Sequence, residues 1–577
     1  MSKQPIIVDI EVYPNFFVAV FRSIKTGAHR VHYLEDAQEI KKLLLTKTMV
    51  GFNSNNYDLP ILWRIADGKV TTHEQIKALN DKIINSNMKH WQHNPQIPMH
   101  KMSSIDLYEV APGVQVSLKQ YGGRMHSPKM QDLPLEPDTV LTDEQKELIT
   151  KYCHNDVDVT EQLYRSLGAQ LDLRRRMSAE YNTDLMSKSD AQIAEAVFRN
   201  KLDNTPKPTI DASLEWQYQP PEWMTNGGIV EGAKFSLNDK LKVIAPKLDK
   251  KHIGIGNSVY SFGIGGLHST EKCAAHHSDN DTVLRDFDVT SYYPGVILGQ
   301  RLYPEQLGEQ FLDVYGSIVN ERIRAKRSGN KVVADSLKIT INGSFGKFGS
   351  KWSFLYSPTL LTQVTLTGQL ALLMLIEQLE GMGVPVVSGN TDGIVVKHSA
   401  DLTNAVDQLV ADWEKQTGFE MEETRYESLY SRDVNNYFAV KGSEIKGKGI
   451  FATPGLMKNP TNRICFEAIT NNALTYQPIE DYICNCTDIT KFLTIRRVTG
   501  GAVKDDELIG KMIRWYYSTE VEGTINYKKN GNKVPRTDGA RPLMDLPAEL
   551  PTDINYDWYI KEARSTMRDC AYEEQSW

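Results

Sequence analysis

The chain has 577 residues, of which 40% are hydrophobic and 24% charged, proportions that are ordinary for a soluble globular protein of about four structural units. It contains no run of about 18 apolar residues, so we expect no segment that spans a membrane. The formal net charge of −7 by itself argues against a nucleic-acid-binding protein, but in a large enzyme basic surface can be local.

The N-terminal part, residues 5–165, has the pattern of an α/β unit. Strands are expected at residues 5–13 ("PIIVDIEVY") and 103–110 ("SSIDLYEV"), and residues 48–58 ("TMVGFNSNNYD") are expected to form a strand that ends in a polar loop. A helical segment follows over 141–176, and Thr142 with Gln145 forms a capping box at its start. Because the strand pattern begins at once and the six cysteines are scattered, we expect no signal peptide, reduced thiols and a cytoplasmic protein.

Acidic residues recur at the strand ends of this unit. Asp9 and Glu11 are two apart on a strand and therefore share a face, where they repel each other unless a cation lies between them. Asp58 follows the next strand, and Tyr152 and Asp156 lie four apart on one helix face. An isolated Asp-x-Glu is more often an exposed strand end. The complete set, however, predicts a site for a pair of Mg²⁺ or Mn²⁺ ions that clamps a phosphodiester.

This set resembles the proofreading 3′–5′ exonucleases that use four acids and a tyrosine. The resemblance implies a catalytic and metal-binding set of Asp9, Glu11, Asp58 and Asp156, with Tyr152 orienting the attacking water. "SLKQY" is similar to the segment that grips a single-stranded primer end in phage enzymes of this type. The resemblance therefore implies DNA contacts at Asn53, Ser117 and Leu118.

The rest of the chain reads as a second α/β unit with additions. Residues 200–260 are rich in Pro, Gly and Asn and look like a connector, and the second unit begins at 262. Helices over 304–327 and 331–347, joined by "SGNK", predict an antiparallel helical hairpin. Strand signals return over 384–452. Basic residues gather in three stretches, 320–352, 441–448 and 496–504.

Two further acids stand at the ends of strands. "SGNTDGIVV" predicts a β-hairpin with Asp392 at its tip, and "DFDVTSYYPGVI" places Asp288 at a strand end before a helix. An aspartate in a turn usually bonds only its own backbone. The two stretches nevertheless resemble motifs C and A of family B DNA polymerases, and "KITINGSFGKFG" resembles motif B. The departures from the family pattern are Tyr292, Gly343, Phe345 and Asn390, where Leu, Ser, Tyr and Asp are usual.

The resemblance implies the roles of individual residues. Two Mg²⁺ or Mn²⁺ ions would lie between catalytic Asp288 and Asp392, with the carbonyl of Val289 as a further ligand. The implied nucleotide-binding residues are Ser291, Tyr293, Arg322, Lys326, Lys338 and Asn342. Tyr293 would lie under the sugar and exclude a 2′-hydroxyl. The implied DNA-binding residues are Tyr437, Lys441, Lys446, Lys448, Gly500, Gly501 and Lys504, and Asn435 stands where the family usually has Lys.

By this resemblance the fold is multidomain α/β and α+β: a ribonuclease H-like exonuclease domain followed by a right-hand polymerase of palm, fingers and thumb. The expected ranges are exonuclease 1–170, connector 171–261, first palm part 262–303, fingers 304–347, second palm part 348–455 and thumb 456–577. The closest overall resemblance is to compact replicative polymerases of tailed phages.

The resemblance implies a DNA-templated DNA polymerase with a 3′–5′ proofreading exonuclease that replicates a phage genome in the cytoplasm of the infected bacterial host. Its partners would be primer–template DNA and dNTPs, with a phage primase or helicase as further partners, no membrane, and a monomeric state. An alternative is an exonuclease with a weakened polymerase site that acts mainly as a DNA-binding module, which only Asn390 supports. A third reading, a structural DNA-binding protein without catalysis, is opposed by the two acidic sets, because bare carboxylates repel DNA.

Overall fold

The computed structural model describes residues 3–86, 101–113, 115–246, 248 and 251–576. The chain divides into two compact units, each built from segments that are far apart in sequence. The first unit consists of Met1–Ser189, Pro454–Arg463 and Cys486–Tyr556, and the second of Asp190–Thr453, Ile464–Asn485 and Asp557–Trp577. Both units mix helices and strands, which confirms the multidomain α/β character expected from the sequence.

The first unit contains a five-stranded sheet in the order β3-β2-β1-β4-β5. Its strands are β1 (Pro5–Tyr13), β2 (Phe16–Ser23), β3 (His29–His32), β4 (Thr48–Gly51) and β5 (Ser103–Asp106). The helices that follow them are α1 (Ala37–Thr46), α2 (Asp58–Ala66), α3 (His73–Asn85), α5 (Leu107–Val110), α6 (Leu118–Arg124), α7 (Asp143–Ser166) and α8 (Gly168–Glu180).

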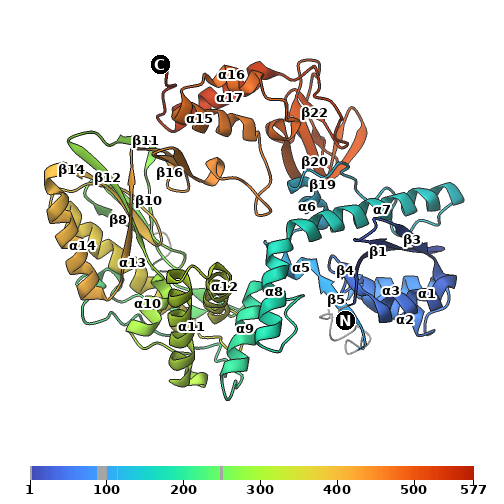
Figure 1. The fold of residues 1–577 in the computed structure, drawn as a ribbon, viewed down its shortest axis with the longest axis horizontal. Coiled ribbons are helices and arrows are strands. Elements are labelled where there is room, and N and C mark those ends of the chain that lie inside the picture. Colours follow the sequence, from blue (N-terminus) through green and yellow to red (C-terminus); the bar gives the residue numbers. More distant parts are fainter. Residues whose placement is uncertain (1–2, 87–100, 114, 247, 249–250, 577) are drawn as a thin grey trace. The chain divides into compact units, whose positions relative to one another are not determined.

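The two faces of this sheet bury different helices. Ile6, Val8 and Ile10 of β1 pack with residues of α1, α2 and α3, whereas Ile7 packs with residues of α7. Figure 1 shows α7 and the α1–α3 group on opposite sides of the sheet. Because strand side chains alternate between faces, Asp9 and Glu11 share the face of Ile7 and point toward α7.

The starts of two helices in this unit, α7 and α5, depend on capping side chains. The capping box of α7 is confirmed, because Thr142 Oγ1 accepts from Gln145 N at 3.4 Å and Gln145 Oε1 accepts from Thr142 N at 2.9 Å. The strand expected over 103–110 is wrong in its second half. Asp106 accepts a hydrogen bond from Tyr108 N at 3.1 Å, and this cap starts the short helix α5.

A second sheet of the first unit comes from the C-terminal part of the chain. Its order is β21-β19-β20-β22, with β19 (Thr494–Lys504), β20 (Glu507–Tyr517), β21 (Asn526–Tyr527) and β22 (Ala540–Pro542). The fully buried Arg514 of β20 ties it to the loop after α6 by donating to Ser127 O at 2.8 Å. The range 456–577, expected to be a thumb, therefore contributes to both units, and the six functional ranges stay predictions.

The second unit holds two four-stranded sheets. One has the order β13-β14-β12-β15, made of β12 (Thr282–Val289), β13 (Val386–Gly389), β14 (Gly393–Ser399) and β15 (Met421–Tyr426). The other has the order β11-β16-β17-β18, made of β11 (Lys272–His277), β16 (Ser428–Asp433), β17 (Asn436–Lys441) and β18 (Glu444–Lys448). The hairpin expected around Asp392 is thereby confirmed as β13–β14.

The second unit also contains helices. They are α9 (Asp190–Lys201), α10 (Tyr292–Gly299), α11 (Gln310–Arg327), α12 (Lys331–Phe348), α13 (Pro358–Gly381), α14 (Thr403–Thr417), α15 (Arg463–Thr475), α16 (Ile479–Cys484) and α17 (Tyr556–Asp569). The expected helical hairpin is formed by α11 and α12. Helix α11 begins at Gln310 and not at 304, because Gly308 has a φ of +64°, which a right-handed helix does not allow. The expected strand region 384–452 was incomplete, since α14 lies within it.

The range expected to be a connector, 171–261, holds most of α8, all of α9 and, after residue 235, several short strands. These strands are β6 (Ser236–Leu237), β7 (Val243–Ile244), β8 (Lys251–Ile255) and β9 (Ser258–Phe262), and β8 and β9 form a small sheet with β10 (His268–Ser269).

Helix α13 is the one described helix with the length and apolar composition of a membrane span. The most apolar part of it is 83% buried inside the structure. Trp413 of α14 donates to its Ala371 carbonyl at 3.0 Å. The contacts of α13 are those of a core helix that supports the sheet carrying Asp288 and Asp392.

Candidate active sites

The first acidic site forms where β1 faces α7. One ligand oxygen from each of Asp9, Glu11 and Asp156 lies within 4.8 Å of the others. Asp9 and Glu11 lie two residues apart on one face of β1, and Tyr152 and Asp156 lie four residues apart on one face of α7. These two faces meet, so the four side chains lie together, as the sequence predicted.

Asp58 joins this site from the start of α2. Its side chain is buried, and among the described residues its Oδ1 has no hydrogen-bond partner. Asp106 fixes the loop that precedes Asp58, because its carboxylate accepts hydrogen bonds from Asn53 N at 2.8 Å and from Asn55 N at 2.9 Å. The loop also needs Asn53 in the left-handed region, at φ +60°, a conformation that Asn tolerates better than most residues. Asp106 was not predicted from the sequence.

Burial and mutual repulsion raise the pKa values of these carboxyl groups. Burial, with the nearby Asp156 charge, raises the pKa of Glu11 to about 8. Burial, partly offset by backbone hydrogen bonds, raises the pKa of Asp58 to about 8. The pKa of Asp9 rises well above its ordinary value, first through burial and then through the charge of Asp58. Asp58 and Asp156 are buried and Asp9 and Glu11 are half-buried, so the four acids form a set of hard oxygen donors that suits Mg²⁺ or Mn²⁺.

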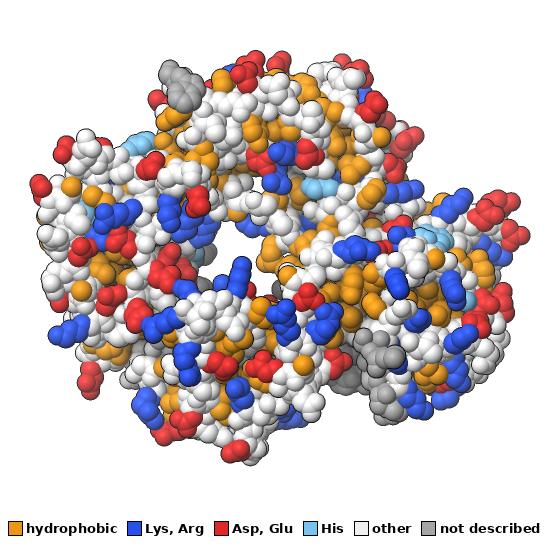
Figure 2. Space-filling view, in the orientation of Figure 1, with side chains coloured by type: hydrophobic (Ala, Val, Ile, Leu, Met, Phe, Trp, Pro, Cys, Tyr) orange, Lys and Arg blue, Asp and Glu red, His pale blue; other side chains and the backbone are white. Residues whose placement is uncertain are grey.

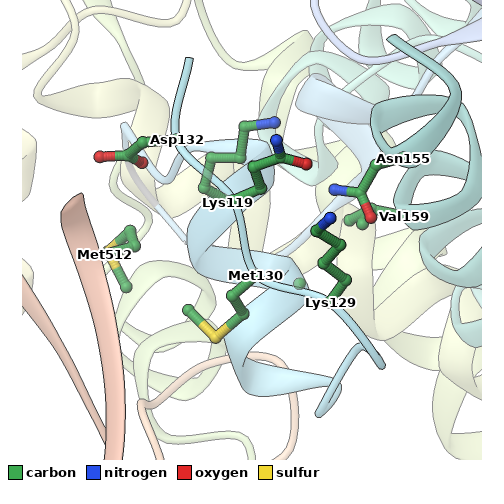
Figure 3. Close-up of a pocket in the computed structure, with 9 residues that line it drawn as sticks. Lys119, Lys129, Met130, Asp132, Asn155, Val159 and Met512 are labelled. Carbon is green, nitrogen blue, oxygen red and sulfur yellow. The ribbon is translucent and has the colours of Figure 1, made fainter. Parts of the chain in front are cut away.

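One cation, Lys119 of α6, reaches this site. Its ammonium group contacts the carboxylate of Asp156 and lies 4.2 Å from the ring centroid of Tyr152. Lys119 also lines a small cavity of about 10 Å³. Figure 3 shows it there with Lys129, Asp132 and Asn155. Lys119 was not predicted as a site residue, although it stands inside "SLKQY".

The neighbours of Lys119 in that segment have structural partners. Ser117 caps α6, because its Oγ accepts from Gln120 N at 3.3 Å, and its own surface is exposed. Leu118 is 8% exposed and belongs to the core under the sheet. The predicted DNA contacts of Asn53, Ser117 and Leu118 stay predictions.

The second acidic site lies at one end of the β12–β14 pair in the other unit. Asp288 pairs with Gly393, and Val289 N donates to Asp392 O at 2.7 Å. A Cβ atom at position 393 would come within 2.3 Å of Asp288 Oδ1, so the glycine provides the space for this carboxylate. Burial, the charge of Asp286 and, to a smaller extent, that of Asp392 raise the pKa of Asp288. Two solvent-exposed acids whose charges interact suit a divalent cation.

The hairpin turn itself is closed by Asn390. Its backbone N donates to Gly393 O at 2.8 Å, and its Oδ1 accepts from Thr391 N at 2.8 Å. The Asn390 side chain therefore bonds the turn backbone, and it carries no charge toward Asp288 or Asp392.

A buried network stands beside Asp288. Asp286, two residues earlier on β12, is 5% exposed and accepts a hydrogen bond from Tyr426 Oη of β15. Lys446 Nζ of β18 lies 2.8 Å from Asp286 Oδ2 and 3.5 Å from Asp288 Oδ2. Burial alone would lower the pKa of Lys446, but its bond to Asp286 and the charge of Asp286 raise it above the ordinary value, so Lys446 remains charged. Asp286 and Tyr426 were not predicted.

The predicted nucleotide-binding residues only partly come together. The rings of Tyr293 on α10 and Phe345 on α12 stack with centroids 4.2 Å apart. Arg322 Nη1 of α11 donates to Ser291 Oγ at 2.9 Å. Lys326 pairs with Glu422 of β15 at 2.7 Å, whereas Lys338 and Asn342 are exposed on α12. The side chains of α10, α11 and α12 thus present cations and rings near the strand end that carries Asp288.

The predicted DNA-binding residues lie on both units. Lys448 pairs with Tyr437 across β17–β18, with its Nζ 5.8 Å from the Tyr437 ring centroid, and Lys441 is exposed at the end of β17. On β19, Gly500 and Gly501 have φ values of +84° and +90°, and Lys504 Nζ donates to Glu522 O at 3.0 Å. Figure 2 shows Lys and Arg side chains intermixed with Asp and Glu on the visible face. Their DNA contacts stay predictions.

No protein-family model matches the chain. Over 203 residues the chain is 24% identical to DNA polymerase II of Escherichia coli strain K12, a match that covers 30% of this chain and 25% of that protein. The chain thus spans about a quarter of the length of the curated relative that it matches. It is also similar to the structure of the family B DNA polymerase from the hyperthermophilic archaeon Pyrobaculum calidifontis, with 14% identity and a TM-score of 0.41, over 100% of this chain and 79% of that one.

Proposed function

We propose that this protein is a DNA-templated DNA polymerase with a 3′–5′ proofreading exonuclease. The observation that carries the proposal is the placement of Asp288 and Asp392 at adjacent strand ends, with Gly393 making room for the Asp288 carboxylate. The sequence similarity to a protein named DNA polymerase II supports it.

In the polymerase site, bound Mg²⁺ or Mn²⁺ would lower the pKa of the primer 3′-hydroxyl and balance the charge of the triphosphate. Asp288 and Asp392 would hold the ions, with the Val289 carbonyl beside them. Arg322, Lys326 and Lys338 would bind the triphosphate, and Lys326 would leave its partner Glu422 to do so. Tyr293, braced by Phe345, would lie under the sugar. Base pairing with the template would select the nucleotide, so that the protein needs no base-specific contacts.

In the exonuclease site, Asp9, Glu11, Asp58 and Asp156 would hold the ions, and Tyr152 would orient the attacking water. Burial and the charge of Asp156 raise the pKa of the Tyr152 hydroxyl, which keeps it protonated and able to donate a hydrogen bond. Asp58 and Asp156 are buried as well, which strengthens their attraction to a cation. Asn53, Ser117 and Leu118 would guide the single-stranded primer end toward them.

We extend the proposal to the biological setting that the sequence suggests. The protein would replicate a phage genome in the cytoplasm of an infected bacterial host, as a monomer that binds primer–template DNA and dNTPs. A phage primase and a helicase would be its partners.

One observation favours a second candidate function. Because Asn390 is neutral where an acid is usual, the protein would be an exonuclease with a weakened polymerase site that acts mainly by binding DNA. Incubating the protein with a labelled primer–template and Mg²⁺, with and without dNTPs, tests both. The main proposal expects extension with dNTPs and shortening without them. Shortening under both conditions would support the second candidate and overturn the first.

A further inference from the structure

Lys446 occupies an unusual position for a lysine at the rim of a sheet. On β18 it pairs with Ala439 of β17, so it shares a face with Tyr437, which lies two residues before Ala439. That face packs against Tyr426 and Leu284 of the sheet that carries the second acidic site. The lysine stem therefore runs toward β12, and the ammonium group arrives between two carboxylates of the same strand.

The two carboxylates differ in what they require. Asp286 is buried, and its hydrogen-bond donor Tyr426 is neutral, so the nearby charge of Lys446 at 2.8 Å balances it. Asp288 has a side chain that is 52% exposed, and its oxygen lies 3.5 Å from the same ammonium group. The buried acid thus anchors a cation beside the acid that faces solvent.

We propose that Lys446 is a positioning residue of the polymerase site: anchored by Asp286 and Tyr426, it holds the Asp288 carboxylate in place and competes with divalent ions for it. The inference rests on the proposed polymerase function. It differs from the role predicted from the sequence, a phosphate contact along the DNA duplex, because the lysine contacts two carboxylates.

The test measures Mn²⁺ binding by electron paramagnetic resonance, in a background of Asp9→Ala with Glu11→Ala so that the first acidic site contributes little. Lys446→Met should raise the Mn²⁺ affinity about three- to tenfold, because a competing charge next to Asp288 is gone. Lys446→Arg should keep the affinity near the parent value. The matched control is Lys397→Met, which removes a lysine from β14 in the same sheet, away from Asp288, and should leave the affinity unchanged.

Primer extension, measured on the same substitutions with the exonuclease intact, gives the second readout. Lys446→Met should need less Mg²⁺ for half-maximal rate but reach a maximal rate about tenfold lower, since Asp288 has lost the group that positions it. Lys446→Arg should restore most of that rate. A substitution that only disturbed the structure of the site would lower both the metal affinity and the maximal extension rate.

Lys446→Met leaves the buried Asp286 carboxylate without a cation, which could unfold the protein. The double variant Asp286→Asn with Lys446→Met removes the Asp286 charge as well and is therefore expected to fold. An unchanged or lower Mn²⁺ affinity in the folded variants would overturn the inference. If the unsubstituted protein fails to extend a primer while Lys446→Met still raises Mn²⁺ affinity, the proposed function fails and the competition between Lys446 and the metal stands.

Discussion

Asp288 on β12 lies directly opposite Gly393 on β14, and the carboxylate of the aspartate fills the space that a side chain at 393 would need. The hairpin that carries Asp392 therefore also shapes the position of its partner acid. A glycine at the end of a strand is often a turn residue only, but here the nearest atoms include Asp288 Oδ1 at 2.3 Å and Phe287 O at 2.8 Å from an added Cβ.

Gly393→Ala should displace Asp288 and lower nucleotide incorporation about 100-fold, the equivalent of about 3 kcal/mol of transition-state stabilisation. Primer shortening without dNTPs should be unaffected, since the acids of the first site lie in the other unit. Single-turnover incorporation rates measure the effect. Gly381→Ala is the control, because an added Cβ there meets nothing within 4 Å. Equal rates for the two alanine variants would contradict the structural role of Gly393.

The two acidic sites should be separable by mutation. Asp9→Ala with Glu11→Ala removes two of the four acids of the first site, and no residue of that site belongs to the unit that holds Asp288. Primer degradation should fall by several orders of magnitude and extension should stay nearly intact. A folded double variant that also lost extension would contradict the assignment of two independent sites.

The first site should make the metal-free protein less stable as the pH rises. Burial and the charge of Asp156 raise the pKa of Glu11 from 4.5 to about 8, so the folded state holds a proton that the unfolded state has released within this window. In EDTA, the thermal unfolding midpoint should therefore fall between about pH 5 and pH 8, and Mg²⁺ should restore it at pH 8.

Glu11→Gln is the comparison for this pH dependence. The neutral amide cannot lose a proton, so the midpoint in EDTA should depend less on pH and should gain less from Mg²⁺. If the substitution left both the pH slope and the Mg²⁺ effect as they are in the unsubstituted protein, the buried acids would not be the cause.

Tyr293 should select deoxynucleotides. Its ring stacks on Phe345, whereas the hydroxyl of the neighbouring Tyr292 donates to Gly368 O inside the core, which leaves Tyr292 in no position to contact a sugar. Tyr293→Ala should raise incorporation of ribonucleotides relative to deoxynucleotides at least about tenfold. Competing the two nucleotides in one extension assay measures the ratio, and an unchanged ratio would remove Tyr293 from this role.

The parts of the sites that lie within one element could be predicted from sequence. The period of two placed Asp9 and Glu11 on one strand face, four-residue spacing placed Tyr152 and Asp156 on one helix face, and the turn residues around Asp392 specified a hairpin. In each case a local rule of backbone geometry fixes the direction of the side chain.

The contacts between elements could not be predicted in this way. Lys119 reaches Asp156 from another helix, and Lys446 reaches Asp286 across 160 positions of sequence. Such contacts depend on how strands and helices pack, and a lysine in a basic stretch has the same local pattern whether it binds solvent, DNA or a buried acid. Asp106 was missed for a similar reason, because its bonds to Asn53 N and Asn55 N come from a loop about fifty positions earlier.

Asn390 should be dispensable for catalysis. Its side chain bonds Thr391 N within the turn and adds no charge, so Asn390→Ala should cost incorporation no more than a few-fold. Asn390→Asp would add the acid that similar polymerases have and should lower the Mg²⁺ concentration needed for half-maximal rate. Titrating Mg²⁺ and Mn²⁺ in an extension assay measures both effects. A loss of orders of magnitude in Asn390→Ala would show that the amide oxygen is itself required.

The most direct test of the central claim is the incorporation rate of Asp392→Asn in Mg²⁺. Asp392 is the acid at the hairpin tip, and without it Asp288 alone must hold the ions, so the rate should fall by several orders of magnitude while primer shortening without dNTPs continues. A near-normal incorporation rate in Asp392→Asn would contradict the claim, because the hairpin would then be a structural turn and the polymerase site would lie elsewhere.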